Sequence, residues 1–368
     1  MFKNIYNNKV VLVTGNTGFK GSWLTTWLLN LGAKVVGLSD KVPTQPSMFE
    51  LLDLQKKIKH YTADVNDFHK VSGIIQSEQP NFIFHLAAQA IVSKSYEDPL
   101  TTIHTNIIGT TNLLEALRIY NKPCTAVFIT SDKCYENVEW TWGYRENDRL
   151  GGKDLYSASK AGAEVVFYAY YNSFFKDRSC PVKLVTGRAG NVIGGGDWAI
   201  NRVVPDCVRA WSVDKPVVIR NPGSTRPWQH VLEPISGYMT LATKLSINPL
   251  LTGNSYNFGP VSDQTFTVKK LISTLADHWS FKSNINNIDI QEVPGFHEAG
   301  LLKLNCDKAL NDLNWKPVLQ FSDAARLTSS WYDSYYHNKE IEIFDYTSAQ
   351  IKEYIDLASN LKLEWTYD

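Results

Sequence analysis

The chain has 368 residues, enough for one large core or two fused ones, and its 43% hydrophobic and 20% charged content is ordinary for a soluble globular protein. Its 37 basic residues balance its 37 acidic residues, so no overall field would attract nucleic acid or an acidic membrane. No apolar stretch approaches the roughly 20 residues that a membrane-spanning helix needs, so we expect no membrane partner.

An apolar strand and a glycine-rich turn stand at the start of the chain. Residues 10–14 (VVLVT) are apolar and mostly β-branched, which is typical of a buried strand. Gly15, Gly18 and Gly21 follow at a spacing of three, so the backbone can turn tightly and approach a pyrophosphate. A helix over 22–31 would present its N-terminal amides and its dipole to that anion. The G-x-x-G-x-x-G spacing is a variant of the usual G-x-G-x-x-G dinucleotide fingerprint.

Strand-like and helix-like patterns alternate through the first half of the chain. Apolar runs predict strands over 34–38, 58–63, 82–86, 126–130 and 182–186, and helical patterns lie around 66–78, 100–120 and 156–175. This alternation predicts an α/β fold, with a doubly wound parallel sheet covered by helices on both faces. Ligands of such sheets bind beyond the carboxyl ends of the strands, so residues that directly follow strands are candidates for a site.

The pattern changes after about residue 190, where a glycine loop at 194–196 and scattered prolines separate short elements. We expect residues 256–259 to return to the main sheet, a short strand near 288, and helices over 268–279, 322–336 and 347–359. The predicted domains are a nucleotide-binding domain over 1–190 with a returning segment near 230–260, an interleaved substrate-binding lobe over 191–345, and a C-terminal helix and tail over 346–368.

Tyr156 and Lys160 form a second candidate motif. At i and i+4 on a helix the two side chains lie on one face, so the ammonium can lower the pKa of the phenol. A phenol with a lowered pKa can take the proton from a substrate hydroxyl while hydride leaves the same carbon. The pair therefore predicts hydride-transfer chemistry.

The glycine turn, followed about 140 residues later by Tyr156 and Lys160, resembles the extended short-chain dehydrogenase/reductase family nearly end to end. The resemblance implies a Rossmann-type fold with a smaller mixed α/β substrate-binding lobe, and NAD as the cofactor.

An acidic residue after the second predicted strand supports NAD as the cofactor. Asp40 can accept hydrogen bonds from the adenosine ribose and repel a 2′-phosphate. The family resemblance implies that Asp64 and Val65 hold the adenine, that Ala87 and Ala88 keep a strand end small, and that Asn106 has a structural role at a helix–sheet junction. The residues expected to bind the cofactor are Gly15, Thr17, Gly18, Phe19, Lys20, Gly21, Asp40, Asp64, Val65, Ala87, Ala88, Thr130, Tyr156 and Lys160.

Two adjacent ionisable residues, Asp132 and Lys133, follow the fifth predicted strand. Simple epimerases and reductases of the family carry little more than Ser or Thr at that position, so the pair predicts additional proton transfers. A sugar 4,6-dehydratase needs them: after oxidation at C4, a base removes the C5 proton, an acid protonates the departing C6 hydroxyl, and hydride returns to C6.

The Asp-Lys pair resembles the CDP-glucose 4,6-dehydratase branch of the family, as do four separate blocks at 17–23, 43–50, 190–198 and 226–231. The resemblance implies that Asp132 is the acid at C6 and Lys133 the base at C5, although Asp132 is also a candidate for the base. As a base Lys133 has to be neutral, which would require burial and the nearby charge of Lys160. Ser131 or Thr130 should bind the C4 oxygen beside Tyr156.

Cationic and amide donors are expected at the nucleotide diphosphate. The resemblance assigns Arg226 and Asn191 to the diphosphate, with Arg202 as a weaker candidate, and His297 and Glu298 to sugar or ribose hydroxyls. Gln89 is expected to reach the sugar.

The sequence therefore predicts conversion of CDP-glucose for a deoxysugar of a surface polysaccharide such as an O-antigen. Two alternatives stay open: a 4,6-dehydratase of another nucleotide sugar (GDP-mannose or UDP-N-acetylglucosamine), and a non-catalytic NAD-binding regulator. Apolar residues of the helices over 100–120 and 156–175 predict a homodimer or a dimer of dimers. Five scattered cysteines without metal-ligand spacing, and a first strand within ten residues of Met1, predict a cytoplasmic protein without zinc or a signal peptide.

Overall fold

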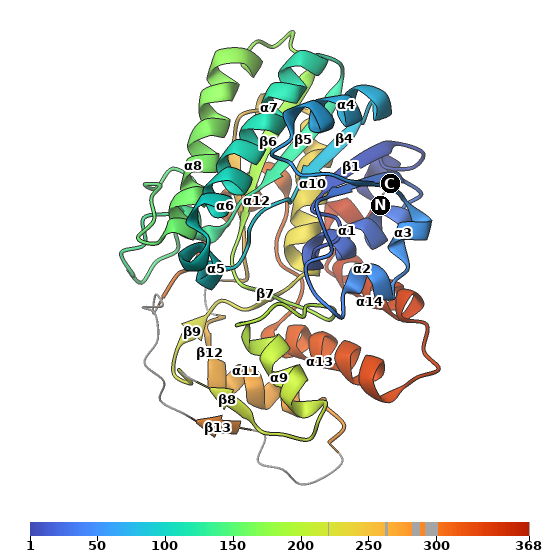
Figure 1. Cartoon of the computed structure of the whole chain (residues 1–368), viewed down its shortest axis with the longest axis vertical. Coiled ribbons are helices and arrows are strands. Elements are labelled where there is room, and N and C mark those ends of the chain that lie inside the picture. The colour runs from blue at the N-terminus through green and yellow to red at the C-terminus, as the bar shows by residue number, and fades with distance from the viewer. Residues whose placement is uncertain (220, 262–263, 282–287, 291–300, 368) are drawn as a thin grey trace.

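The computed structural model describes residues 1–219, 221–261, 264–281, 288–290 and 301–367, and a seven-stranded parallel sheet forms its centre (Figure 1). The strand order is β11-β6-β5-β4-β1-β2-β3. The strands are β1 (Val10–Thr14), β2 (Lys34–Ser39), β3 (Lys59–Thr62), β4 (Phe82–His85), β5 (Cys124–Ile129), β6 (Val182–Ala189) and β11 (Ser255–Phe258). The predicted Rossmann-type sheet is confirmed, and its winding changes direction between β1 and β4, where such sheets bind ligands.

Helices cover both faces of the sheet because successive side chains of each strand point to opposite faces. Leu12 and Ile83 belong to the apolar cluster under α4 (Phe68–Glu78), α7 (Gly109–Tyr120) and α8 (Leu155–Tyr170). Val11 and Phe84 belong to the larger cluster under α1 (Phe19–Asn30) and α10 (Leu232–Ile247). Strands that are buried on both faces account for the near-continuous apolar runs in the sequence.

The helices predicted over 100–120 and 156–175 are each interrupted in their backbone hydrogen-bonding pattern. The first consists of α6 (Pro99–Ile103), a π-helical turn (His104–Ile108) and α7, and the second of α8 followed by a π-helical turn (Tyr171–Phe175). Helix α8 begins after Asp154, whose carboxylate accepts hydrogen bonds from the backbone N–H and the hydroxyl of Ser157 at 2.9 and 2.6 Å. This cap fixes the start of the helix that carries Tyr156.

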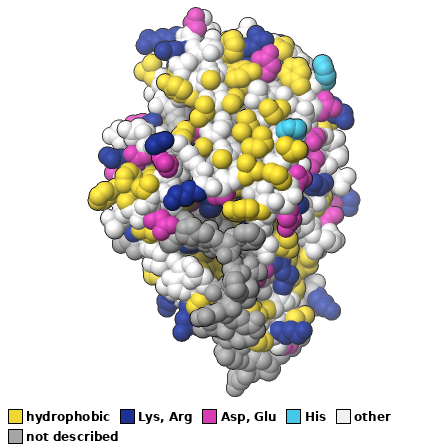
Figure 2. Space-filling view, turned by 60° about the vertical axis from the view of Figure 1, so that its left-hand side comes forward, with side chains coloured by type: hydrophobic (Ala, Val, Ile, Leu, Met, Phe, Trp, Pro, Cys, Tyr) yellow, Lys and Arg dark blue, Asp and Glu magenta, His cyan; other side chains and the backbone are white. Residues whose placement is uncertain are grey.

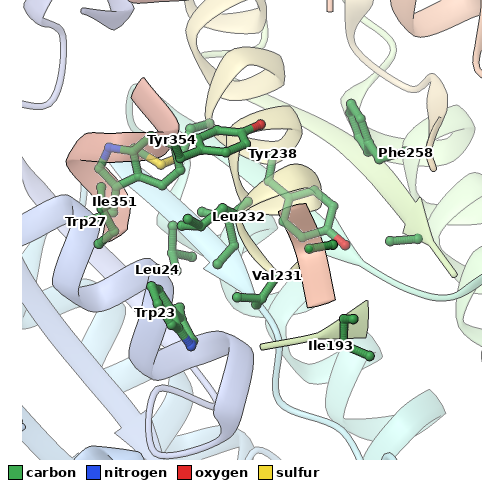
Figure 3. Packing of buried hydrophobic residues seen from close by; sticks show 14 of the residues in the cluster. Trp23, Leu24, Trp27, Ile193, Val231, Leu232, Tyr238, Phe258, Ile351 and Tyr354 are labelled. Carbon is green, nitrogen blue, oxygen red and sulfur yellow. The ribbon is translucent and has the colours of Figure 1, made fainter. Parts of the chain in front are cut away.

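The lower part of the molecule in Figure 1 is a smaller mixed lobe. It contains α9 (Val203–Trp211), α11 (Val268–Ala276), α13 (Phe321–His337) and three two-stranded pairings: β7 (Val192–Ile193) with β10 (Gln229–His230), β8 (Val217–Ile219) with β13 (Ile288–Ile290), and β9 (Thr225–Arg226) with β12 (Phe266–Thr267). Its apolar residues belong to the same buried cluster as α1 and α10, and Figure 3 shows Ile193, Trp23 and Tyr238 within that cluster. The division of the chain at 190 and 345 stays a prediction. Among the described residues, none of the helices combines the length and apolar character that spanning a bilayer requires.

The C-terminal helix α14 (Ile343–Asn360) packs against α1 and fastens the two chain ends together. Trp365, just beyond α14, stacks on Phe2 and on Tyr354 with ring centroids 5.1 and 5.9 Å apart. Trp27 of α1 meets the edge of this group, as Figure 3 shows for Trp27 and Tyr354. The tail therefore closes the core on the face of α1 that points away from the sheet.

A buried carboxylate in the first turn of α10 holds the connection to α13. Glu233 Oε1 accepts the backbone N–H groups of Val318 and Leu319 at 2.9 and 2.6 Å, and Oε2 accepts the hydroxyl of Tyr354 at 2.8 Å. Burial raises the pKa of Glu233 to about 7 despite these three donors. The folded state therefore binds a proton more tightly than the unfolded chain, and the resulting stability is lost as the pH rises through 7.

Replacement of this carboxylate by an amide should make stability less dependent on pH. In Glu233→Gln the amide oxygen can still accept both backbone N–H groups, and no charge is buried at high pH. We expect the variant to match wild type near pH 5 and to have a Tm higher by about 2 °C or more near pH 8.5, measured by calorimetry. Glu353→Gln, on α14 and partly exposed, should show no such pH-dependent difference. A Glu233→Gln variant without its advantage at pH 8.5 would contradict this account.

Candidate active site

In the turn after β1, glycines leave no side chains between the backbone and a ligand at the N-terminus of α1. Gly15 has φ +73°, and a Cβ there would lie 2.8 Å from the backbone nitrogen of Ala87 at the end of β4. A Cβ on Gly21 would lie 2.1 Å from the carbonyl oxygen of Gly15. Gly18 caps α1 without a side-chain hydrogen bond. A bare turn at the start of a helix fits the pyrophosphate of a dinucleotide such as NAD.

The residues predicted for the adenosine end follow neighbouring strands. Asp40 directly follows β2, is 53% exposed and lies 3.3 Å from the ammonium of Lys41. Asp64 follows β3, and Val65 is buried against α7, where it contacts Gly109. Both carboxylates therefore lie at the carboxyl edge of the sheet. Their roles toward a ribose and an adenine stay predictions.

Three other predicted ligands have hydrogen bonds of their own within the protein. The hydroxyl of Thr17 donates to the carbonyl of Lys41 at 2.7 Å and holds the turn after β2. The amide of Gln89 donates to the carbonyl of Ile91 and the hydroxyl of Thr102, both at 3.0 Å. The hydroxyl of Thr130 donates to Glu164. Thr130 and Ser131 are both predicted to bind the C4 oxygen, and the hydroxyl of Ser131 likewise donates to a carboxylate, that of Asp132, at 2.9 Å.

The segment after β4 is tied to α8. Asn106, in the π-helical turn before α7, donates to the hydroxyl of Ser159 at 2.8 Å and to the backbone carbonyl of Gln89 at 3.1 Å. Its amide oxygen accepts the N–H of Gln89 at 2.9 Å. These bonds fix the small strand end, Ala87 and Ala88, next to the helix that carries Tyr156. They agree with a structural role for Asn106.

Tyr156 and Lys160 of α8 lie buried beside a short turn, Asp132–Cys134, that follows β5. Burial raises the pKa of Tyr156, although the charge of Lys133 and a hydrogen bond from Ser131 lower it. Burial also lowers the pKa of Lys160 to about 8. Burial outweighs these two effects on the phenol, and the prediction that Lys160 lowers its pKa stays a prediction.

Asp132 is buried at the centre of this turn. Its Oδ1 accepts the hydroxyl of Ser131 at 2.9 Å and lies 3.6 Å from the ammonium of Lys133. Its Oδ2 is buried without a hydrogen-bond partner among the described residues, and a Cβ on Gly190 would lie 3.2 Å from it. The side chain of Lys133 is 33% exposed, and its role as the base at C5 stays a prediction.

Sequence reasoning did not foresee how many cations meet here. The ammonium of Lys20 lies 5.9 Å from the ring centre of Tyr238, and burial together with the charge of Arg202 lowers the pKa of Lys20 to about 7. Arg202 pairs with Asp197 at 2.8 Å, and its charge also acts on Tyr156. The sequence suggested Arg202 only for the diphosphate, a role that stays a prediction. A lysine inside the glycine turn was the available signal for Lys20.

Two of the four other residues predicted to bind the nucleotide diphosphate and the sugar or ribose hydroxyls lie within the described part of the chain. Arg226 lies in β9, and its guanidinium donates to the carbonyl of Thr225 at 2.8 Å. Asn191 lies between β6 and β7, and its carbonyl accepts the N–H of Gln229 at 3.3 Å. His297 and Glu298 lie outside the described residues. The roles predicted for these four residues therefore stay predictions.

The sequence analysis also missed a buried ion pair behind the reaction centre. Arg188 at the end of β6 binds Glu164, which lies one helical turn beyond Lys160 on α8. No local spacing pointed to this pair, because Arg188 lies 24 residues beyond Glu164 on a different element.

Comparisons with known proteins identify relatives of the whole chain. Residues 12–328 match the family model described as GDP-mannose 4,6 dehydratase. The CDP-glucose 4,6-dehydratase of Salmonella typhimurium is 42% identical over 356 residues, which cover 94% of this chain and 98% of that protein. Among solved structures, the UDP-glucose 4-epimerase of Thermotoga maritima with UDP-glucose has a TM-score of 0.75 at 21% sequence identity. The match covers 89% of this chain and 99% of the epimerase chain. The dTDP-glucose 4,6-dehydratase of Bacillus anthracis in complex with NAD has a TM-score of 0.72 at 21% identity, covering 90% and 98%. The structural likenesses show the fold.

The bare glycine turn makes dinucleotide binding sensitive to a single methyl group. In Gly21→Ala the new Cβ meets the backbone oxygen of Gly15, so α1 has to move away from the turn. We expect the Kd for NADH, measured by fluorescence titration, to rise at least about tenfold, or about 1.4 kcal/mol. Gly73→Ala is the control, because a Cβ on Gly73 of α4 meets nothing within 4 Å. Equal NADH affinities of both variants and wild type would refute this reading of the turn.

Proposed function

The chain belongs to the family of nucleotide-sugar 4,6-dehydratases, and on that premise we propose that it is an NAD-dependent CDP-glucose 4,6-dehydratase, a hydro-lyase. It converts CDP-glucose to CDP-4-dehydro-6-deoxyglucose and water. The observation that carries the proposal is the adjacent pair Asp132 and Lys133 beside Tyr156, since oxidation at C4 alone requires neither member of the pair. The relative that is 42% identical supports CDP-glucose as the substrate.

The first part of the reaction takes place at the C4 hydroxyl of the sugar. Ser131 binds the C4 oxygen, and Tyr156 accepts its proton, as general acid–base catalysis requires. NAD, bound at the glycine turn, supplies the acceptor and later the donor of the hydride. Because burial raises the pKa of Tyr156, the charge of Arg202 helps the phenol to give up its proton, while Lys133 has to be neutral for the step that follows.

The second part removes water across C5 and C6. Lys133 takes the C5 proton, which the C4 ketone has made acidic, and Asp132 protonates the departing C6 hydroxyl through Oδ2. This oxygen suits the role because no described donor competes for it. The distance of 3.6 Å between Lys133 Nζ and Asp132 Oδ1 is longer than a hydrogen bond, so the return of the proton from Lys133 to Asp132 after each turnover requires one bridging water or a small movement of the Lys133 side chain.

A dehydratase acting on GDP-mannose or UDP-N-acetylglucosamine remains the nearest alternative, because the same chemistry serves any nucleotide. A non-catalytic NAD-binding regulator is disfavoured, since it would need none of Tyr156, Lys160, Asp132 and Lys133. We further propose a cytoplasmic enzyme that supplies deoxysugar for a surface polysaccharide such as an O-antigen. Its five cysteines are free thiols, which suits a reducing compartment.

The elimination step distinguishes this enzyme from simple oxidoreductases of the same fold. In heavy water we expect wild type to turn over CDP-glucose faster than dTDP-, UDP- or GDP-sugars and to place deuterium at C5 of the product. Lys133→Met should still form reduced cofactor on the enzyme and then stall, whereas Tyr156→Phe should lose about 10²–10⁴ in rate at the first step. Mass spectrometry and absorbance near 340 nm, the ordinary band of reduced nicotinamide, follow these two steps.

The possible outcomes are distinct. Product without deuterium at C5 would refute the elimination mechanism, and a strong preference for another nucleotide sugar would refute CDP-glucose as the substrate. Normal turnover by Lys133→Met would retain the mechanism and assign the base to Asp132.

We also propose that the protein is a homodimer, or a dimer of dimers, built on α7 and α8. Large apolar side chains are exposed on these helices and on the π-helical turns beside them: Ile108, Ile119, Val165, Tyr168 and Phe174. Figure 2 shows hydrophobic side chains gathered over the upper part of one face of the molecule. Family members pair through such helices, and apolar surface of this kind favours association.

A charge introduced on this surface should prevent the association. Val165, 56% exposed on α8, would be buried in the proposed interface, so we expect Val165→Glu to be monomeric at micromolar concentration by light scattering. Val218→Glu is the control, because Val218 is 50% exposed on β8 of the smaller lobe. A monomeric wild type at the same concentration would contradict the proposed dimer.

A further inference from the structure

A buried ion pair lies behind the reaction centre and takes no part in the proton transfers described above. The guanidinium of Arg188 on β6 donates to Glu164 of α8 through Nε at 3.0 Å and through Nη2 at 2.8 Å. Both side chains are almost fully buried. A bidentate pair of this kind has a fixed geometry, and loss of one partner would leave an uncompensated buried charge.

The pair is connected to both ends of the turn that carries Ser131, Asp132 and Lys133. Before this turn, the hydroxyl of Thr130 donates to Glu164. After it, the hydroxyl of Tyr135 accepts a hydrogen bond from Nη1 of Arg188 at 2.8 Å and donates to Asn257 of β11 at 2.8 Å. One ion pair therefore ties the turn after β5 to the helix that holds Tyr156 and Lys160.

Glu164 lies one helical turn beyond Lys160 on α8, so the two side chains share one face of the helix and the carboxylate acts on the charge of Lys160. Burial lowers the pKa of Lys160, and the charge of Glu164 opposes that effect. The other titratable groups acting with Lys160 are Cys134 of the turn, His85 of β4 and Lys20 of α1. Burial raises the pKa of the Cys134 thiol and lowers that of His85 to about 3, so both groups are neutral at pH 7. The charges of Lys20 and Lys160 repel each other, so a protonated Lys20 disfavours protonation of Lys160.

We propose that Glu164, held by Arg188, is a positioning residue that keeps Lys160 protonated and fixes the turn Ser131–Lys133 against Tyr156. This inference rests on the proposed dehydratase reaction, in which both groups take part. Glu164 needs no contact with the substrate or with NAD for this role. Its removal should change the pH at which the enzyme works, which a purely structural residue would not do.

The decisive variant is Glu164→Gln in the full-length protein, because it keeps the shape and an acceptor oxygen but removes the charge. Without the nearby anion Lys160 loses its proton at lower pH, so we expect the basic limb of the pH profile of kcat/KM to move down by about one pH unit. Activity would then fall about tenfold relative to wild type above that limb and much less below it. Glu164→Asp, which keeps the charge, should restore the position of the limb. Ser255→Ala on β11 is the control, because it removes the hydrogen bonds of this hydroxyl with Arg188, Glu164 and Thr186 but leaves every charge in place.

A second measurement does not depend on turnover. The Kd for NADH, titrated by fluorescence between pH 6 and 9.5, should start to rise at lower pH in Glu164→Gln than in wild type, because Lys160 is expected to hold the cofactor. If wild type fails to dehydrate CDP-glucose while the NADH profile still shifts, the substrate is wrong and the role of Glu164 stands. Profiles with unchanged pH dependence in Glu164→Gln would overturn the inference.

A separate variant tests whether the hydrogen bond to Glu164 holds the turn Ser131–Lys133 in place. This variant also tests the proposal if Glu164→Gln does not fold. Thr130→Val removes one hydrogen bond to Glu164 and leaves every charge in place. We expect kcat to fall at least about tenfold with the basic limb unmoved and the Tm within a few degrees of wild type. An unchanged kcat would overturn the positioning role.

Discussion

Burial of charge at the carboxyl end of the sheet is the constraint on which the rest of the structure depends. The ammonium groups of Lys20 and Lys160 lie where burial lowers their pKa to about 7 and 8. Such groups stay in place only if nearby anions and a rigid surrounding offset the loss of hydration. Glu164 and Asp132 are the carboxylates that stand among these cations.

These buried charges require a rigid surrounding structure, because movement of the backbone or of neighbouring side chains would let water reach them. Apolar clusters on both faces of the sheet hold the strand ends in register. The larger cluster, under α1 and α10, extends without a break into the smaller lobe. The tail contributes as well, since Trp365 and Tyr354 cover α1 from outside. Asp132, Tyr156 and Lys160 are buried within this packing, so a small local movement does not hydrate them.

The same rigidity explains how acid and base can stand next to each other in sequence. Asp132 is buried on the sheet side of its turn, whereas Lys133 reaches a partly exposed position 3.6 Å away. Their different environments assign them different parts of one elimination. An epimerase or reductase of this fold would gain nothing from such a pair, and for this reason the proposed dehydratase reaction rests on it.

The sequence by itself determined the architecture and which residues are candidates for binding and catalysis. Apolar β-branched runs, three spaced glycines and the i, i+4 pair Tyr156–Lys160 are local signals, and they predicted the parallel sheet, the dinucleotide turn and the acid–base pair. Asp132 and Lys133 stood out for the same reason, as ionisable residues directly after a buried strand.

Only the tertiary structure decided how these groups act on one another. It placed the charge of Lys20 near Asp132 and Lys160 and that of Arg202 near Tyr156, and it turned the hydroxyl of Thr130 toward Glu164. It also showed that burial raises the pKa of Tyr156 and leaves Lys133 partly exposed. None of this is encoded in local spacing, because pKa values depend on burial and on charges contributed by distant parts of the chain. The partners Glu164 and Arg188 are 24 residues apart and became visible as a pair only once α8 was packed against β6.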